Sequence, residues 1–203
     1  ASLSVASRNA APTVSGPVTL PDTVEDASSI TITTAQLIAN ANDVDLPPDT
    51  LSVVNLSTMA GGTLTDNLDG TWTYTPPTDF NGTVTFTYQV SDGTDVSAVT
   101  SASLYVDPRN DAPTVSGPVA LPNTWEDDAS FPVTITTTQL LANASDIDLP
   151  LDSLSVVNLT TMDGGTLTDN LDGTWTSTPT ANFNGTVTFT YQVSDGTATS
   201  AAT

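Results

Sequence analysis

The chain contains no cysteine, no histidine and no lysine, and its only basic residues are Arg8 and Arg109. Without cysteine, neither disulfides nor thiolate chemistry is available. Without lysine, a Lys–Asn isopeptide crosslink cannot form. No apolar run is long enough to span a bilayer, and no charged and apolar leader opens the chain. We therefore expect a mature extracellular fragment.

Nearly all of the charged side chains are acidic. The 203 residues include 23 acidic side chains, giving a formal net charge of -21, and only Glu25 and Glu126 among them are glutamate. Such a charge repels nucleic acid phosphates and anionic membrane surfaces, so neither is expected as a partner. Aspartate prefers turns, where its short side chain can bind a metal ion.

An internal repeat organises the chain. Ala-Ser-Leu-Ser-Val at residues 1–5 recurs as Ala-Ser-Leu-Tyr-Val at 102–106, an offset of 101 residues. From Thr31 and Thr134 onward the offset is 103, so the second copy has gained two residues in the region 128–133. Each copy has the usual size of one domain.

The repeat predicts two tandem domains at 8–107 and 108–203, joined at Asp107-Pro-Arg-Asn-Asp-Ala-Pro113. Residues 1–7 are expected to be the closing strand of a preceding repeat and its linker. The counterpart of Thr100 is Thr203, so the second domain lacks most of its closing strand.

Short alternating runs separated by turn residues predict an all-β fold of two Ig-like Greek-key β-sandwich domains. At 83–90, Val, Phe, Tyr and Val share one face and threonines the other, and the same strand is expected at 186–193. The stretch 63–75 reads as a hairpin around Asn-Leu-Asp-Gly, with Trp72 and Tyr74 on its inner face. One short helical turn per domain is expected at 34–40, capped by Thr34, and at 137–143.

Chemistry has to come from acidic turns, because the sequence offers no other reactive side chains. Oxygen ligands without nitrogen or sulfur suit Ca²⁺. Aspartate is also simply common in turns, and we favour that role for Asp66, Asp69 and Asp172. For the Asp-x-Asp pairs at 43–45 and 146–148 we favour metal binding, because they recur together with acids beside a domain joint.

A resemblance covers nearly the whole chain. Asn110-Asp-Ala-Pro113, Glu25-Asp26, the Asp-x-Asp pairs, Asp79-Phe-Asn-Gly82 and Tyr88-Gln-Val-Ser-Asp-Gly93 resemble the cadherin-like tandem repeats of large secreted bacterial adhesins of the RTX type. That family implies Ca²⁺ between domains, held by a glutamate of one domain, the linker, and the aspartates of the next. The ligands implied here are Glu25, Asn110, Asp111, Asp146, Asp148 and Asp195, with Asp79 and Asp107 as additions.

The chain departs from the cadherin pattern in two ways. Asp107 precedes Asn110 by three residues rather than two, and no Leu-Asp-Arg-Glu motif is present. In addition, Ala6 and Ala10 of the first copy stand where the second has Asp107 and Asp111. Any Ca²⁺ ahead of the first copy should therefore bind more weakly, since affinity depends on ligand charge and number.

These features predict a stiff, elongated rod that serves as a structural extender of an extracellular adhesin or filament, without enzymatic activity. Repeats would associate head to tail, with residues 1–5 of one chain completing the second domain of the next. A carbohydrate-binding module is the alternative, because Trp125 replaces Val24 and an exposed tryptophan could stack on a sugar. We favour a covering role for Trp125, beside the inserted Phe131.

Overall fold

The computed structural model describes residues 2–4, 8–27, 29–45, 49–59, 61–125, 132–148 and 153–203. It divides into two compact units, unit 1 (Ala1–Arg109) and unit 2 (Asn110–Thr203). Both are built almost entirely of strands, each with one short helix, which confirms the predicted fold class. The expectations that involve Ala6, Glu126 and Phe131 lie outside the described residues.

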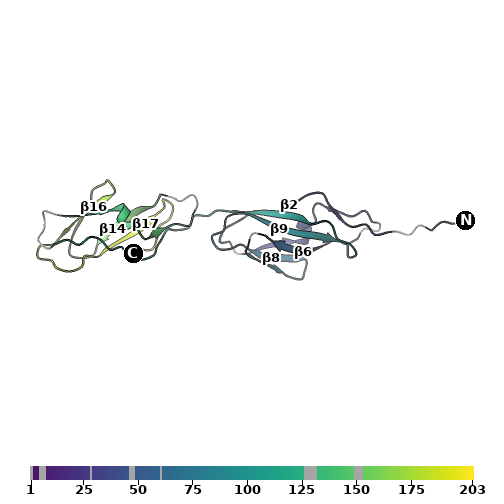
Figure 1. The fold of residues 1–203 in the computed structure, drawn as a ribbon, viewed down its shortest axis with the longest axis horizontal. Helices are drawn as coiled ribbons and strands as arrows, with labels where there is room; N and C mark the ends of the chain where they lie inside the picture. The colour runs from purple at the N-terminus through teal and green to yellow at the C-terminus, as the bar shows by residue number, and fades with distance from the viewer. Residues whose placement is uncertain are drawn as a thin grey trace. The chain divides into compact units, whose positions relative to one another are not determined.

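Unit 1 is a sandwich in which two layers face each other (Figure 1), and its strands pair antiparallel except that β2 and β3 pair with β10 in parallel. One sheet has the order β2-β10-β9-β6, with β3 also pairing with β10, and the other has the order β4-β8-β7. A short pair of β1 and β5 completes the unit. Its elements are β1 Thr13–Val14, β2 Val18–Thr19, β3 Thr23–Val24, β4 Ile30–Thr33, α1 Thr34–Leu37, β5 Ala41–Asn42, β6 Ser52–Thr58, β7 Thr63–Asp66, β8 Thr71–Thr75, β9 Gly82–Ser91 and β10 Thr100–Asp107.

The core of unit 1 lies between the inner faces of these two sheets. The alternating apolar side chains of β9 are all at most 1% exposed, as the period of two requires. Tyr74 of β8 meets Phe86 of β9 edge to face, with ring centroids 5.0 Å apart. β10 adds Ala102, Leu104 and Val106, which are equally buried. The predicted strand at 83–90 and the inner-face position of Tyr74 are therefore confirmed.

The hairpin predicted at 63–75 is also confirmed. β7 pairs antiparallel with β8, and the turn between them holds Leu68 in the left-handed region at φ 61°. Asp66 accepts a hydrogen bond from the Leu68 amide at 2.8 Å, and Asp69 accepts one from the Thr71 amide at 3.0 Å. These two aspartates stabilise a turn, the role that we expected for them.

The helical turn is present, but the predicted cap is displaced by one residue. Thr33, not Thr34, is the N-cap of α1, because Gln36 at the third helical position reaches back and forms a capping box with it. Thr34 instead donates its hydroxyl to the Gly70 carbonyl at 2.8 Å, which ties the helix to the hairpin turn. Unit 2 repeats this arrangement with Thr136 and Gln139.

Unit 2 repeats the same elements up to its last strand. β12 pairs with β16 and β16 with β15, β14 pairs with β17, and β11 pairs with β13. Its elements are β11 Thr114–Val115, β12 Val133–Thr136, α2 Thr137–Leu140, β13 Ala144–Ser145, β14 Ser155–Thr161, β15 Gly165–Asp169, β16 Thr174–Pro179 and β17 Phe189–Ser194. Figure 1 shows β14, β16 and β17 within this unit.

The strand predicted at 186–193 is shorter than expected. β17 begins only at Phe189 and ends at Ser194. In unit 1 the corresponding first half of β9 pairs with β10 rather than with β6. In unit 2 only Thr203 reaches the β10 position, where it exchanges two backbone hydrogen bonds with Tyr191. Residues 186–188 therefore lack the neighbour that makes their counterparts a strand.

A tyrosine hydroxyl links the helix to the sheet in each unit, which gives a test of the packing. Tyr88 donates to the Leu37 carbonyl at 2.6 Å. We expect Tyr88→Phe to lower the free energy of unfolding by about 1–3 kcal/mol, because a buried carbonyl loses its donor. Urea denaturation measures this. Tyr105→Phe, at a residue that is 43% exposed, is the control and should change little; equal effects of both substitutions would contradict the assignment.

Candidate functional site

The leading end of unit 2 gathers five of the residues singled out in the sequence. Asn110 donates one side-chain hydrogen bond to Asp195 at 3.0 Å and another to the Asp111 carbonyl at 2.7 Å. Asp195 is buried in the turn after β17, with 9% of its surface exposed. The Asn110 side chain thus ties the linker to the turn that contains Asp195.

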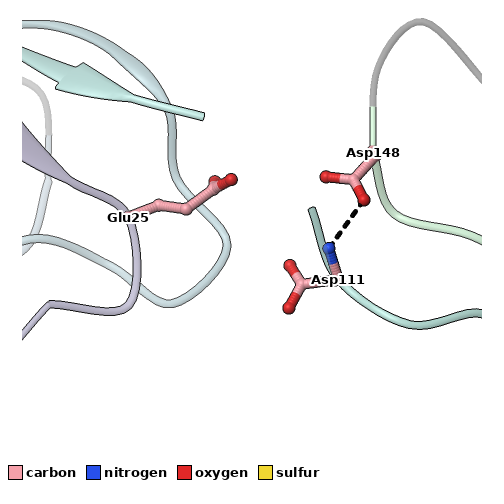
Figure 2. Close-up of side chains that lie close together, drawn as sticks. All are labelled: Glu25, Asp111 and Asp148. Atoms are coloured by element: carbon pink, nitrogen blue, oxygen red, sulfur yellow. Dashed lines mark hydrogen bonds between the residues drawn. The ribbon is translucent and has the colours of Figure 1, made fainter. Parts of the chain in front are cut away.

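The Asp-x-Asp pair of unit 2 lies against the same linker. The Asp111 amide donates to Asp148 at 2.8 Å (Figure 2), and the Asp148 amide donates to Asp146 at 3.1 Å. These bonds use one oxygen of each carboxylate. The other oxygen of Asp146 is buried, and none of the described residues donates a hydrogen bond to it. A buried carboxylate oxygen without a donor is costly unless a cation compensates it.

The leading end of unit 1 has the same backbone geometry. The Ala10 amide donates to Asp45 at 2.7 Å, and the Asp45 amide donates to Asp43 at 2.9 Å. Asn9 donates to Asp92 at 3.0 Å, as Asn110 does to Asp195. The second oxygen of Asp43 is buried and receives no hydrogen bond within the described part of the chain, which repeats the situation of Asp146.

Two further acids at this end were not identified from the sequence. Asp95 accepts a hydrogen bond from Asn9 at 2.9 Å and has Ala198 as its counterpart in unit 2. Unit 1 thus has an alanine at position 10 but an extra carboxylate at position 95. Asp49 offers an oxygen that lies within 4.8 Å of oxygens of Asp43 and Asp45. The Asp-x-Asp-x₃-Asp spacing was the available signal for Asp49. For Asp95 the signal was a comparison of the turn after β9 with the turn after β17.

Glu25 is held at the trailing end of unit 1. Its side chain is only 1% exposed and accepts hydrogen bonds from the Asn81 amide group at 3.2 Å and from the Arg109 backbone amide. Its own amide donates to the Asp107 carbonyl at 3.0 Å, which continues the pairing of β3 with β10. A buried glutamate fixed by hydrogen bonds is a pre-organised oxygen ligand.

The two added candidates lie at the same end of unit 1, both with exposed side chains. The Asp79 amide donates to Asp26 at 3.3 Å, so Asp79 adjoins the residue that follows Glu25. Asp79 and Asp26 have φ angles of 54° and 56°, in the left-handed region that aspartate tolerates in turns. Asp107 closes β10 and meets Glu25 through its backbone carbonyl.

Hydrogen bonds keep Asp92, in the turn after β9, and Asp195, in the turn after β17, ionised. The amides of Ala198 and Thr197 donate to Asp195, and together with Asn110 they lower the pKa of its carboxyl below the ordinary value of 3.8. The amides of Asp95 and Thr94 lower the pKa of Asp92 in the same way, with a smaller effect from Asn9. Both side chains are therefore anionic at neutral pH and able to bind a cation.

Trp125 is the last described residue before the gap at 126–131, so the covering role expected beside Phe131 stays a prediction. Its side chain is 82% exposed. It lines a groove of unit 2 together with Leu121, Val187 and Phe189. No helix in the described part of the chain is both long and apolar enough to cross a membrane.

Two facing β-layers with acidic residues at the ends of each unit define a tandem-repeat β-sandwich of the kind found in cadherins. The family model for the cadherin-like domain matches residues 8–107 and again 109–203, so the chain belongs to the cadherin-like domain family. No match was found among curated protein sequences.

Solved structures with the same fold include mouse cadherin-23 repeats EC22-24, at 18% identity and a TM-score of 0.54, covering 95% of this chain and 62% of that one. Protocadherin gamma B2 repeats 1–5 match at 15% identity and a TM-score of 0.49, over 95% of this chain and 38% of that one. An endo-fucoidan hydrolase of glycoside hydrolase family 107 matches at 22% identity and a TM-score of 0.38, over 93% of this chain and 27% of the hydrolase. The chain thus spans about a quarter of that enzyme's length.

The lowered pKa of Asp195 predicts a pH-dependent contribution to stability. A group with a depressed folded-state pKa stabilises the fold above its unfolded pKa, and this contribution is lost as the pH falls through the folded pKa. We therefore expect Asp195→Asn to destabilise unit 2 at pH 7, with the difference from wild type shrinking below about pH 4. Denaturation at a series of pH values measures it, with Asp163→Asn at an exposed turn as control. A difference that stays constant down to pH 2 would contradict the assignment.

Proposed function

We propose that this chain is a structural extender segment of an extracellular adhesin or filament, and that its repeats bind Ca²⁺ at their acidic ends. The observation that carries the proposal is the pair of buried carboxylate oxygens on Asp43 and Asp146 that receive no hydrogen bond from the described residues. They occupy equivalent positions of the two repeats. A buried polar atom that recurs in this way calls for a partner, and a bound cation would supply one at both positions.

The ligands that surround these oxygens suit calcium. In unit 2 the available oxygens belong to Asp111, Asp146, Asp148, Asp195 and the side-chain carbonyl of Asn110. All are hard oxygen donors, and Ca²⁺ takes six to eight of them with irregular geometry. The backbone bonds to Asp146, Asp148 and Asp195 hold the carboxylates in place before any ion arrives, which favours binding.

We further propose that the acids at the trailing end of unit 1 share in this site. Glu25, Asp79 and Asp107 belong to that end, and the sequence from Asp107 to Asp111 leads directly from it to the ligands of unit 2. Carboxylates that share one ion would repel one another in its absence. A bound divalent cation cancels that repulsion and fixes the linker. The consequence is a stiff rod rather than two freely hinged domains.

The proposed function of the chain is then to form a long, stiff spacer. Its proposed location and partners follow from that function. We propose that the chain acts outside the cell, as part of a secreted adhesin of the RTX type, with similar repeats as head-to-tail partners. A net charge of -21 keeps such a rod soluble. We propose no catalytic role, because the acidic side chains of the described residues lie in turns and at the ends of the sandwich rather than as a pair in a cleft.

A carbohydrate-binding role is the second candidate, favoured by the exposure of Trp125. If the indole stacks on sugar rings, the wild-type chain should bind members of a glycan array, and Trp125→Ala should lose that binding. A matched control is Val24→Trp, which places the same side chain on unit 1. Absence of binding by the wild-type chain would eliminate this candidate.

The calcium proposal predicts a large effect of chelation on stability. At a free Ca²⁺ concentration 100 times the Kd, binding stabilises the folded chain by about 2.7 kcal/mol, which corresponds to a rise in Tm on the order of 10 °C. Differential scanning calorimetry in EDTA and in millimolar Ca²⁺ measures it. Identical Tm values in the two conditions would contradict the proposal.

A substitution of Asp146 should separate the cost of its buried charge from its contribution to Ca²⁺ binding. We expect Asp146→Asn to raise the Tm in EDTA, because it removes a buried uncompensated charge, and to reduce the gain on adding Ca²⁺. The control Asp172→Asn, in a hairpin turn of the same unit, should leave that gain unchanged. An unchanged Ca²⁺ gain in Asp146→Asn would remove Asp146 from the site.

A further inference from the structure

Each unit has a β-bulge that brings an asparagine out of its sheet. The register between β6 and β9 shifts between Val54 and Ser57, and β14 has the same shift against β17 at the equivalent position. Such a shift inserts an extra residue that is left out of the strand pairing. Asn55 and Asn158 lie in these bulges with φ angles of 58° and 54°, in the left-handed region that asparagine adopts more readily than most residues.

The side-chain amides of these two asparagines are accessible. Both residues are exposed. Asn55 donates one hydrogen bond to the Gln89 side chain at 3.0 Å, and Asn158 donates one to the Gln192 side chain at 2.8 Å. An amide group carries two N–H donors, so each asparagine keeps one that no described residue accepts. Surface positions of this kind tolerate a change with little effect on stability.

Each asparagine begins an Asn-x-Ser/Thr triplet, the acceptor motif for N-linked sugars. The triplets are Asn55-Leu-Ser57 and Asn158-Leu-Thr160. Their middle leucines are partly buried and pack against the core of each unit. The hydroxyl-bearing third residues are exposed, as the asparagines are. The two groups that the motif requires therefore lie together on the accessible side of the strand.

The fold already uses the amide groups of other triplets. Asn143 donates to the Gly117 and Pro118 carbonyls at 3.2 Å and 3.1 Å, so its amide holds the segment that follows β11. Asn81 donates to Glu25, which is only 1% exposed. A sugar on either nitrogen would break these contacts. The triplet at Asn184 is exposed too, but in a loop rather than at a bulge of a sheet.

We propose that Asn55 and Asn158 are acceptor sites for N-linked glycosylation, one on each repeat. The side-chain Nδ2 forms a bond to the anomeric carbon of a sugar that is carried as a glycosyl diphosphate. The bond from that carbon to the phosphate oxygen breaks, the diphosphate leaves, and an amide proton passes to a base of the glycosyltransferase. No atom is oxidised or reduced in this transfer.

The sites lie on an uncharged part of a strongly acidic chain. None of the residues of β6, β9, β14 and β17 carries a charge. The carboxylates proposed to bind Ca²⁺ lie in other segments, at the ends of the units. Glycosylation therefore leaves those ligands untouched, and either proposal can fail without the other. A glycan at each bulge would add a neutral, hydrated layer along the rod.

The first experiment is peptide mapping by mass spectrometry on the protein isolated from the cells that produce it. Peptides that contain Asn55 and Asn158 should carry the added mass of at least one hexose. Ser57→Ala should abolish the modification of Asn55 and leave that of Asn158, because it removes the hydroxyl of the first triplet only. Ser52→Ala, at an exposed serine of the same strand outside the triplet, is the control and should change neither. Unmodified peptides in the wild-type protein would overturn the proposal.

A second experiment tests whether the fold selects the sites. The folded chain is incubated with nucleoside diphosphate glucose and a purified glycosyltransferase that recognises Asn-x-Ser/Thr. Asn143 should react at least about tenfold more slowly than Asn55, because local opening must first free its amide. Synthetic peptides of residues 50–60 and 138–148 should react at similar rates. Equal rates at the two asparagines of the folded chain, or an unreactive peptide 138–148, would overturn selection by the fold.

Discussion

Buried carboxylate oxygens without a hydrogen-bond donor are the constraint on which the ends of both units depend. Asp43 and Asp146 each use one oxygen to hold the backbone of the Asp-x-Asp turn and leave the other uncompensated within the described residues. Such an oxygen needs a partner other than the described side chains, and an ordered water or a bound cation can serve. A divalent cation would compensate the charge of this oxygen and would also bind the neighbouring carboxylates. The geometry of the turn is thereby linked to the proposed stiffness of the linker.

The two repeats form a natural comparison, because one fold carries two slightly different sequences. At the leading end, unit 1 has Ala10 and Asp95 where unit 2 has Asp111 and Ala198. Asp95 thus replaces one of the two carboxylates that the first copy lacks at positions 6 and 10, which lessens the expected weakening of a site ahead of unit 1.

Much of the fold could be predicted from the sequence, because it rests on local periodicity. The alternation at 83–90 and the turn residues around Leu68 required no knowledge of distant partners. The length of β17 depends on pairing with a strand far away in sequence, so local alternation predicted too long a strand. The cap moved from Thr34 to Thr33 because Gln36 supplies the second half of a capping box. At the site, comparison of the two copies shows Asp95 in place of Ala198, but its contact with Asn9 joins segments 86 residues apart and comes from the fold.

The central claim is that Ca²⁺ turns two hinged repeats into a rigid pair. The absence of cysteine allows unambiguous spin labelling at the exposed, equivalent positions Ala35→Cys and Thr138→Cys. Double electron–electron resonance then measures the distribution of distances between the two labels. The account predicts a narrow distribution in millimolar Ca²⁺ and a broad one in EDTA. Distributions of equal width in both conditions would contradict it.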